Sequence, residues 1–164
     1  MKITDLRTLL VHELKDIHSA ETQLLHALPK MAKAAKHPEL KQAFENHLNQ
    51  TTEHLARIEK IFETLEYKPT GTTCAAMKGL VEEGRDMIAE DAPDNVKDAG
   101  LIASAQRVEH YEMAAYGCAR AFARELGLDS IVETLTLTFD EEVAADRMLT
   151  EIAETAINAS AVDG

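Results

Sequence analysis

Four segments of this chain carry apolar residues at every third or fourth position, and polar residues interrupt each of these stripes near its middle. This spacing is that of one face of an α-helix, so the chain is predicted to bury four helical faces against one another. Isolated ionised carboxylates are costly to bury, so these polar residues need a partner. The interrupting residues are Glu21 in the first stripe, His47 and His54 in the second, Glu109 and Glu112 in the third, and Glu142 and Asp146 in the fourth.

The first two stripes place their polar residues at one height. If two helices pair antiparallel about a tight turn, residues equidistant from the turn meet. The midpoint of Glu21 and His54 falls between His37 and Pro38, where proline favours the start of a new helix. We therefore expect Glu21 and His54 to face each other.

The last two stripes show the same symmetry about a glycine. Gly127 is the midpoint of Glu112 and Glu142, and the midpoint of Glu109 and Asp146 follows it directly. Glycine is the usual residue just after a helix end. Both hairpins are thus predicted to bring their polar pairs to the same level.

Composition and connection lengths favour an all-α fold. Aromatic residues make up 4% of the chain and tryptophan is absent, as in many helical bundles. Two tight hairpins joined by one long crossover are the topology of a ferritin-like four-helix bundle, here with a short fifth helix in the crossover. We predict a single domain over residues 1–164, with helices over about 4–35, 38–66, 74–90, 95–126 and 129–157.

Charge and targeting signals limit the classes of function. The net charge of −12 argues against a nucleic-acid-binding protein, which normally has a basic face. We find no run of about 18 apolar residues and no signal peptide, so we expect a cytoplasmic protein without membrane contact. Cys74 and Cys118 are too few for a disulfide framework or a rubredoxin-type centre and are interpreted as packing residues.

The polar cluster is predicted to hold metal ions. Iron, manganese and zinc accept carboxylate oxygen and imidazole nitrogen, and ferritin-like sites bind a metal pair with carboxylates from four helices. A buried polar network without metal is the alternative. The expected ligands are Glu21, His54, Glu109, Glu112, Glu142 and Asp146.

Three further residues are expected to support the cluster. His47 would contact the ligands or simply pack, and Tyr116 would hydrogen-bond a ligand, act as a redox relay or be a core tyrosine. Gln50 flanks the second stripe and can face inward as a weak ligand. Tyr111 and His110 lie off the third stripe and are expected at the surface.

Several segments resemble the YciF/YciE-type ferritin-like proteins of bacteria: DIHSAETQLLHALPKMAKAA, CAAMKGLVEEG, AQRVEHYEMAAYG and DEEVAADRMLTEIA. The resemblance implies a rubrerythrin-like helical core, a homodimer and a role in general stress responses. It carries over five of the expected ligands as they stand here, namely Glu21, Glu109, Glu112, Glu142 and Asp146.

The chain departs from this family in the second and fourth stripes. Gln50 stands where the family tends to have glutamate, and His54 stands where it often has glutamine. The fourth stripe lacks the Glu-x-x-His of rubrerythrins, because residue 145 is alanine. A neutral amide is a weaker ligand than a carboxylate, so one ion instead of two remains an open expectation.

Three functions fit these patterns. The first is a di-metal carboxylate protein with iron or manganese that acts on O2 or peroxide under stress; without a rubredoxin-like domain, its electrons would come from a separate donor or from bound iron. The second is a non-enzymatic structural or interaction protein with a vestigial or stabilising site. The third is iron storage, which needs a large closed oligomer.

Overall fold

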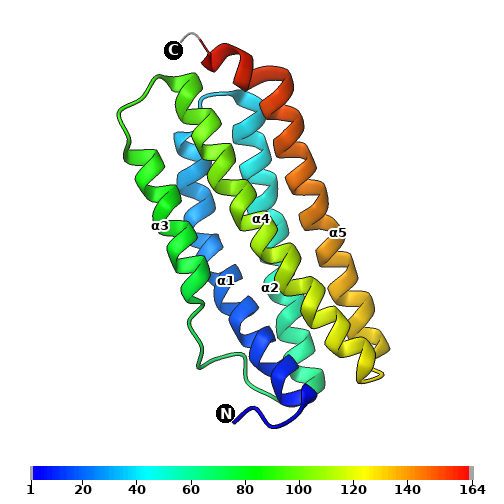
Figure 1. Ribbon diagram of the computed structural model, residues 1–164. Helices are drawn as coiled ribbons and strands as arrows, with labels where there is room; N and C mark the ends of the chain where they lie inside the picture. The colour runs from blue at the N-terminus through cyan, green and yellow to red at the C-terminus, as the bar shows by residue number, and fades with distance from the viewer. Residues whose placement is uncertain (1, 163–164) are drawn as a thin grey trace.

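The computed structural model describes residues 2–162, and within this range every regular element is a helix (Figure 1). The prediction of an all-α protein is confirmed. The π-helix Ala153–Ile157 and the 3-10 helix Asn158–Ala161 follow the last α-helix. The five α-helices are α1 (Leu6–Ala34), α2 (Pro38–Leu65), α3 (Ala75–Ala89), α4 (Asp94–Glu125) and α5 (Asp129–Ile152).

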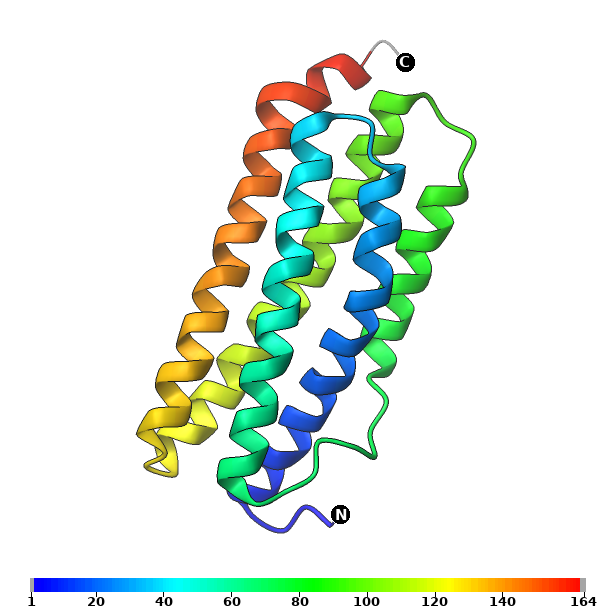
Figure 2. The same ribbon diagram turned by 180° about the vertical axis from the view of Figure 1, so that it is seen from behind.

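Two helical hairpins pack against each other. α1 pairs with α2 and α4 pairs with α5, while α1 also contacts α4 and α2 contacts α5. The connection from α2 to α4 runs the length of the molecule and contains α3, which packs on the outside against α1 and α4 (Figures 1 and 2). No helix of residues 2–162 is long and apolar enough to cross a membrane.

Helix ends differ from the prediction by a few residues. α1 begins two residues after the predicted start at residue 4, and Asp5 caps it: the Asp5 side chain accepts from the backbone N–H of Thr8, and the Thr8 side chain accepts from the Asp5 N–H. α5 begins at Asp129, the predicted start of the last helix. The α-helical hydrogen bonding ends at Ile152, so the helix expected to residue 157 finishes as a π-helix instead.

The two predicted turns form where the sequence places them. Pro38 is the first residue of α2. Gly127 has φ +67°, and the backbone bonds from Gly127 to Arg124 and from Leu128 to Ala123 complete a Schellman motif at the end of α4. Buried Asp98 of α4 accepts hydrogen bonds from the backbone of residues 36 and 37 and holds the first turn against α4.

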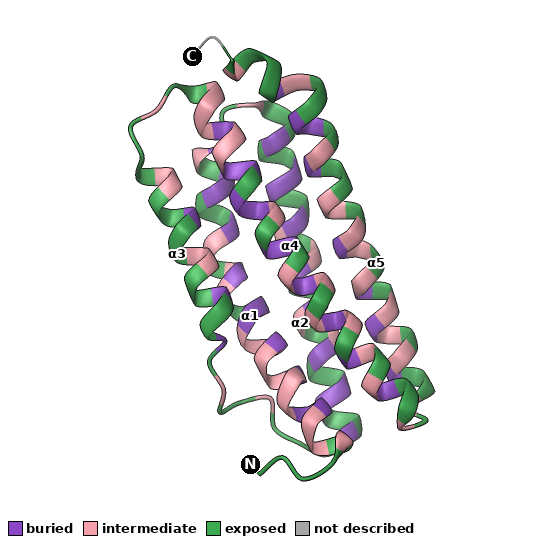
Figure 3. Cartoon of the chain, viewed as in Figure 1, coloured by how far each residue is buried: buried purple, intermediate pink, exposed green. Residues whose placement is uncertain are grey.

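The apolar core is divided into two clusters by a polar layer. One cluster includes Leu24, Phe44 and Ile102, and the other includes Ile17 and Ile58. The polar stripe residues of all four long helices lie between these clusters, where Figure 3 shows buried positions on each helix. Cys74 is buried as expected, whereas Cys118 is exposed and is not a packing residue.

Candidate metal centre

Four helices contribute buried polar side chains to one layer at mid-height of the bundle. The contributing residues are Glu21 from α1, His47 and His54 from α2, Glu109 and Glu112 from α4, and Glu142 from α5. None of these residues is more than 5% exposed. The equal spacing of Glu21 and His54, and of Glu112 and Glu142, from their turns is therefore realised in three dimensions, whereas Asp146, the predicted partner of Glu109, lies outside the layer.

One group of potential ligands consists of Glu21, His54 and Glu142. His54 Nδ1 lies 2.9 Å from Glu142 Oε1 and 3.5 Å from Glu21 Oε1. All three residues are fully buried. Two carboxylates and one imidazole nitrogen thus converge on one point.

A second group consists of His47, Glu109, Glu112 and Glu142. His47 Nε2 lies 3.4 Å from Glu109 Oε1, and 3.9 and 3.8 Å from carboxylate oxygens of Glu112 and Glu142. The potential ligand atoms in each group lie within 4.8 Å of one another. Glu142 belongs to both groups, which places it where a carboxylate can bridge two ions.

The donor set fits a pair of hard or borderline divalent metals. Most of its polar atoms are buried without a hydrogen-bond partner, including both carboxylate oxygens of Glu112 and Glu142 and both ring nitrogens of His47. Buried polar atoms are rarely left unpaired, and the mixture of oxygen and nitrogen atoms is one that iron, manganese and zinc accept. Coordination to a metal ion would give these oxygen and nitrogen atoms the partners that they lack.

Without metal, the carboxylates differ in protonation. Burial raises the pKa of Glu109 and Glu112 well above the usual range, and the charge of Glu142 raises both further. Burial opposes ionisation of Glu142 as well, but the hydrogen bond to His54 and the charge on His54 outweigh it and lower the Glu142 pKa. The protein therefore holds one carboxylate ionised beside two that retain protons.

The histidines differ in the same way. Burial lowers the pKa of His47 and keeps its ring neutral. Burial also opposes the charge on His54, but its contacts with Glu142 and Glu21 prevail and raise the pKa to about 10. Since a metal ligand must be neutral imidazole or ionised carboxylate, metal binding would release protons from this centre.

Glu141 orients His54 from outside the cluster, and its position off the fourth stripe gave no reason to predict this role. His54 Nε2 lies 2.9 Å from Glu141 Oε2, and Arg57 holds the same carboxylate with Nη2 at 3.2 Å from Oε1. A second carboxylate partner of this kind fixes the ring and its tautomer in metal sites. The sequence contains one indication of this contact. Arg57 lies three residues after His54 on the same side of α2, so a carboxylate that contacts one can contact the other.

Tyr116 is fully buried, and its hydroxyl donates a hydrogen bond to Glu21. This is one of the roles expected for it. The contact fixes one oxygen of Glu21 and leaves Oε2 without a partner.

The structure places Asp146 and Gln50 at the edge of the cluster, with Gln50 beside His47. Asp146 is partly exposed and lies 3.2 Å from Gln106 Nε2 and 3.4 Å from His110 Nε2. Gln50 is half-buried and lines cavities on the outer side of α2 and α5. His47, expected as a supporting residue, takes a central place instead.

The surface location expected for Tyr111 is wrong. Its hydroxyl donates to Asp16 and lies 3.0 Å from Cys74 Sγ, so the ring ties the start of α3 to α1 and α4. His110 is exposed, as expected. The surface location was predicted from the stripes of the four long helices alone. The prediction did not include the contact of Tyr111 with the start of α3.

Fold and site together define an all-helical protein with a buried cluster of histidine and glutamate side chains. Residues 5–162 match the family described as a domain of unknown function, DUF892. The chain belongs to this family of YciF-like proteins.

Two relatives show how far the likeness extends. Protein YciF of Escherichia coli is 39% identical over 162 residues, which are 98% of each chain, and the crystal structure of this stress protein superposes with a TM-score of 0.92 over 95% of this chain and 99% of YciF. YcfI of Rhodopseudomonas palustris, described as a candidate structural protein, is 42% identical with a TM-score of 0.88 over 91% and 95% of the two chains.

Proposed function

We propose that this protein is a ferritin-like di-metal carboxylate protein of the stress response, which binds iron or manganese and reacts with peroxide or O2. The observation that supports this most strongly is the convergence of unpartnered, buried oxygen and nitrogen atoms from four helices. The two hairpins joined by a crossover with α3 match the topology of ferritin-like bundles. The stress role follows from the YciF relative.

The residues divide the work between binding and orientation. Glu21 and His54 would hold one ion, His47, Glu109 and Glu112 would hold the other, and Glu142 would contact both. Glu141 would keep His54 Nδ1 aimed at the ion by accepting from Nε2, and Tyr116 would hold Glu21 in place. When bound, two ferrous ions would supply the two electrons that, with two protons from solvent, reduce hydrogen peroxide to two waters.

A cavity on the α2–α5 side offers a route to the centre for small polar molecules. It encloses about 350 Å³, and its lining includes Asn46, Asn49 and Gln50 together with His47 and Glu109. Amide side chains can hydrogen-bond water or peroxide without binding metal tightly. Gln50 would then line the entrance of the cavity, and the set of metal ligands would be complete without it.

A structural role is the second candidate, because YcfI of Rhodopseudomonas palustris is described in those terms. In that case bound metal would stabilise the fold without turnover. The proposal also retains the homodimer that the family resemblance implies and a separate electron donor for repeated turnover. Size-exclusion chromatography distinguishes a dimer from the closed shell that iron storage needs.

Peroxide consumption distinguishes the two candidates. Protein loaded anaerobically with Fe²⁺ is mixed with hydrogen peroxide, and the remaining peroxide is measured. We expect one peroxide to be consumed for each pair of bound ions, and Glu142→Ala to abolish this fast phase. Asp140→Asn, an exposed neighbour on α5, is the matched control and should behave as wild type. A rise in melting temperature on Fe²⁺ addition without peroxide consumption would establish the structural role instead.

A further inference from the structure

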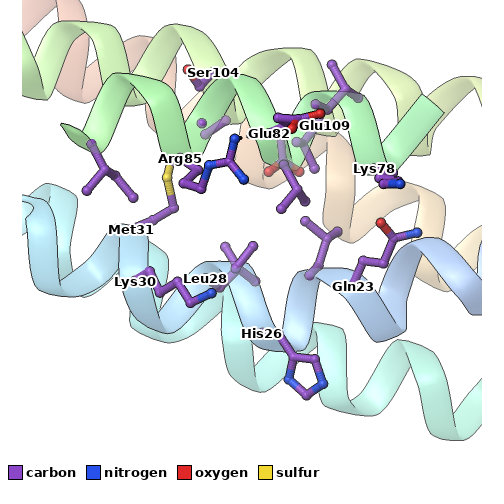
Figure 4. A pocket seen from close by; sticks show the side chains of 18 residues that line it. Gln23, His26, Leu28, Lys30, Met31, Lys78, Glu82, Arg85, Ser104 and Glu109 are labelled. Carbon is purple, nitrogen blue, oxygen red and sulfur yellow. Dashed lines mark hydrogen bonds and ion pairs between the residues drawn. The ribbon is translucent and has the colours of Figure 1, made fainter. Parts of the chain in front are cut away.

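A second cavity lies between α1 and α3, with α4 behind it, and encloses about 250 Å³. Its walls are mainly apolar and include Leu28 and Met31 of α1, Val81 and Ile88 of α3, and Val108 of α4. Figure 4 shows Leu28 and Met31 on α1 facing α3 across the opening. Small-molecule sites span about 300–1,000 Å³, so this smaller space suits one unbranched chain better than a ring system.

The cavity is open because α3 is packed lightly. Met77 and Gly84 are the residues of α3 that are buried. A Cβ atom at Gly84 would lie 3.6 Å from Met31 Sδ, so a larger side chain there would enter the space between the helices. Glycine at this position keeps the cavity clear.

The inner end of this cavity reaches the candidate metal centre. Glu109 lines it, and Glu109 also lines the polar cavity on the α2–α5 side. Glu109 Oε1 lies 3.4 Å from His47 Nε2. A chain bound between α1 and α3 would therefore end beside a carboxylate of the centre.

The mouth of the cavity carries positive charge in an acidic protein. Lys30 of α1 and Lys78 and Arg85 of α3 line it. Glu82 is the one carboxylate of the lining that is exposed. Arg85 pairs with Glu82 and with Asp86 outside the lining, whereas the chain as a whole has a net charge of −12. Exposed cations around an apolar space favour a ligand with an anionic head and an alkyl tail.

We propose that this cavity binds a medium-chain alkyl carboxylate, with its head at the cationic rim formed by Lys30, Lys78 and Arg85 and its tail directed along Leu28 and Val108 toward Glu109. Binding in this position requires only the apolar walls and the cationic rim. Alkyl carboxylate binding is therefore a separate property from the peroxide chemistry proposed above, and it does not depend on bound metal.

Isothermal titration calorimetry on the full chain as purified tests this with dodecanoate below its micelle concentration. We expect saturable binding of one molecule per chain. Dodecyltrimethylammonium has the same tail and the opposite charge, and it should bind at least about tenfold more weakly. Equal affinity for both probes, or no saturable dodecanoate binding, would overturn the proposal. EDTA should leave the dodecanoate affinity unchanged, and a loss of binding with the metal would contradict the independence of the two sites.

Variants locate the binding. Lys30→Glu with Lys78→Glu should weaken dodecanoate binding about tenfold or more, whereas Lys41→Glu with Lys60→Glu, an equal charge change on exposed positions of α2, should change it less than about twofold. Ala27→Phe, which fills the cavity from α1, should abolish binding while the circular dichroism melt stays cooperative. If Ala27→Phe binds normally, or if sedimentation shows that it dissociates a dimer that wild type forms without fatty acid, the cavity is not a fatty-acid site.

Discussion

At the scale of single residues, His47 and Asp146 show what the polar stripes predict about the ligands and what they do not. Both lie on polar stripes, and sequence spacing ranks Asp146 as a ligand because aspartate four residues after Glu142 can share its face. In the structure Asp146 pairs with His110 and Gln106 instead. Spacing fixes the face of a helix but not the rotation that brings one side chain into the layer and leaves another at its edge.

This difference gives a direct comparison between two alanine variants. His47→Ala removes an imidazole that lies among three buried carboxylates, so we expect it to lose at least half of the bound metal. Asp146→Ala should retain the wild-type metal content, because its contacts lie outside both ligand groups. Metal per chain after equal loading measures both. Loss in Asp146→Ala with retention in His47→Ala would restore the assignment made from spacing.

Glu141 provides a second test at this scale. Glu141→Gln keeps the size of the side chain but weakens the acceptor for His54 Nε2. Changes to such supporting carboxylates typically lower metal affinity about 10–100-fold, and we expect a loss in this range by anaerobic Fe²⁺ titration. Glu53→Gln, on an exposed position beside His54, is the control. An unchanged affinity in Glu141→Gln would mean that His54 is not held for metal.

At the scale of helices, sequence predicts the turns better than the ends. Pro38 and Gly127 each mark a specific backbone geometry, and both turns form as expected. The π-helix Ala153–Ile157 has no such marker, since its residues read as continued α-helix. The end of α2 was placed near Glu66, but nothing in the sequence indicated that Glu66 itself would take the left-handed conformation.

Glu66 therefore offers a stabilising substitution. It has φ +60° in a Schellman motif, where its N–H bonds to Glu63 and that of Tyr67 bonds to Phe62. Glycine adopts this conformation without strain, so Glu66→Gly should raise the free energy of unfolding by about 0.5–1 kcal/mol. Gly127→Ala, the reciprocal change at φ +67°, should lower it by about 1 kcal/mol. Urea unfolding measures both, and a destabilised Glu66→Gly would contradict the capping geometry.

At the scale of the whole molecule, the buried charges make stability depend on pH and metal together. Glu109, Glu112 and His54 have raised pKa values in the folded protein, and their unfolded counterparts have released protons by about pH 7. The folded state then binds more protons than the unfolded one, so the metal-free protein loses stability as pH rises from 7 toward 10. His54, whose pKa is raised to about 10, contributes a slope of about 1.4 kcal/mol per pH unit over this range.

Thermal melts from pH 7 to 9.5 check this dependence. We expect the melting temperature of the chelator-treated protein to fall by several degrees, since about 1 kcal/mol corresponds to about 2–4 °C for a chain of this size. Metal binding displaces the same protons, so the loaded protein should show a shallower fall. A metal-free protein whose melting temperature stays constant or rises over this range would not contain the protonated cluster described here.

Metal content per chain is the first measurement to make, because it shows whether the buried histidine and glutamate cluster holds ions. Protein purified without chelators or a histidine tag is analysed by inductively coupled plasma mass spectrometry, together with Glu142→Ala. Because two ligand groups share Glu142, we expect close to two equivalents of iron or manganese per wild-type chain and a loss of both in the variant. A wild-type chain that contains no metal, and that takes up none on anaerobic addition of Fe²⁺, would contradict this expectation.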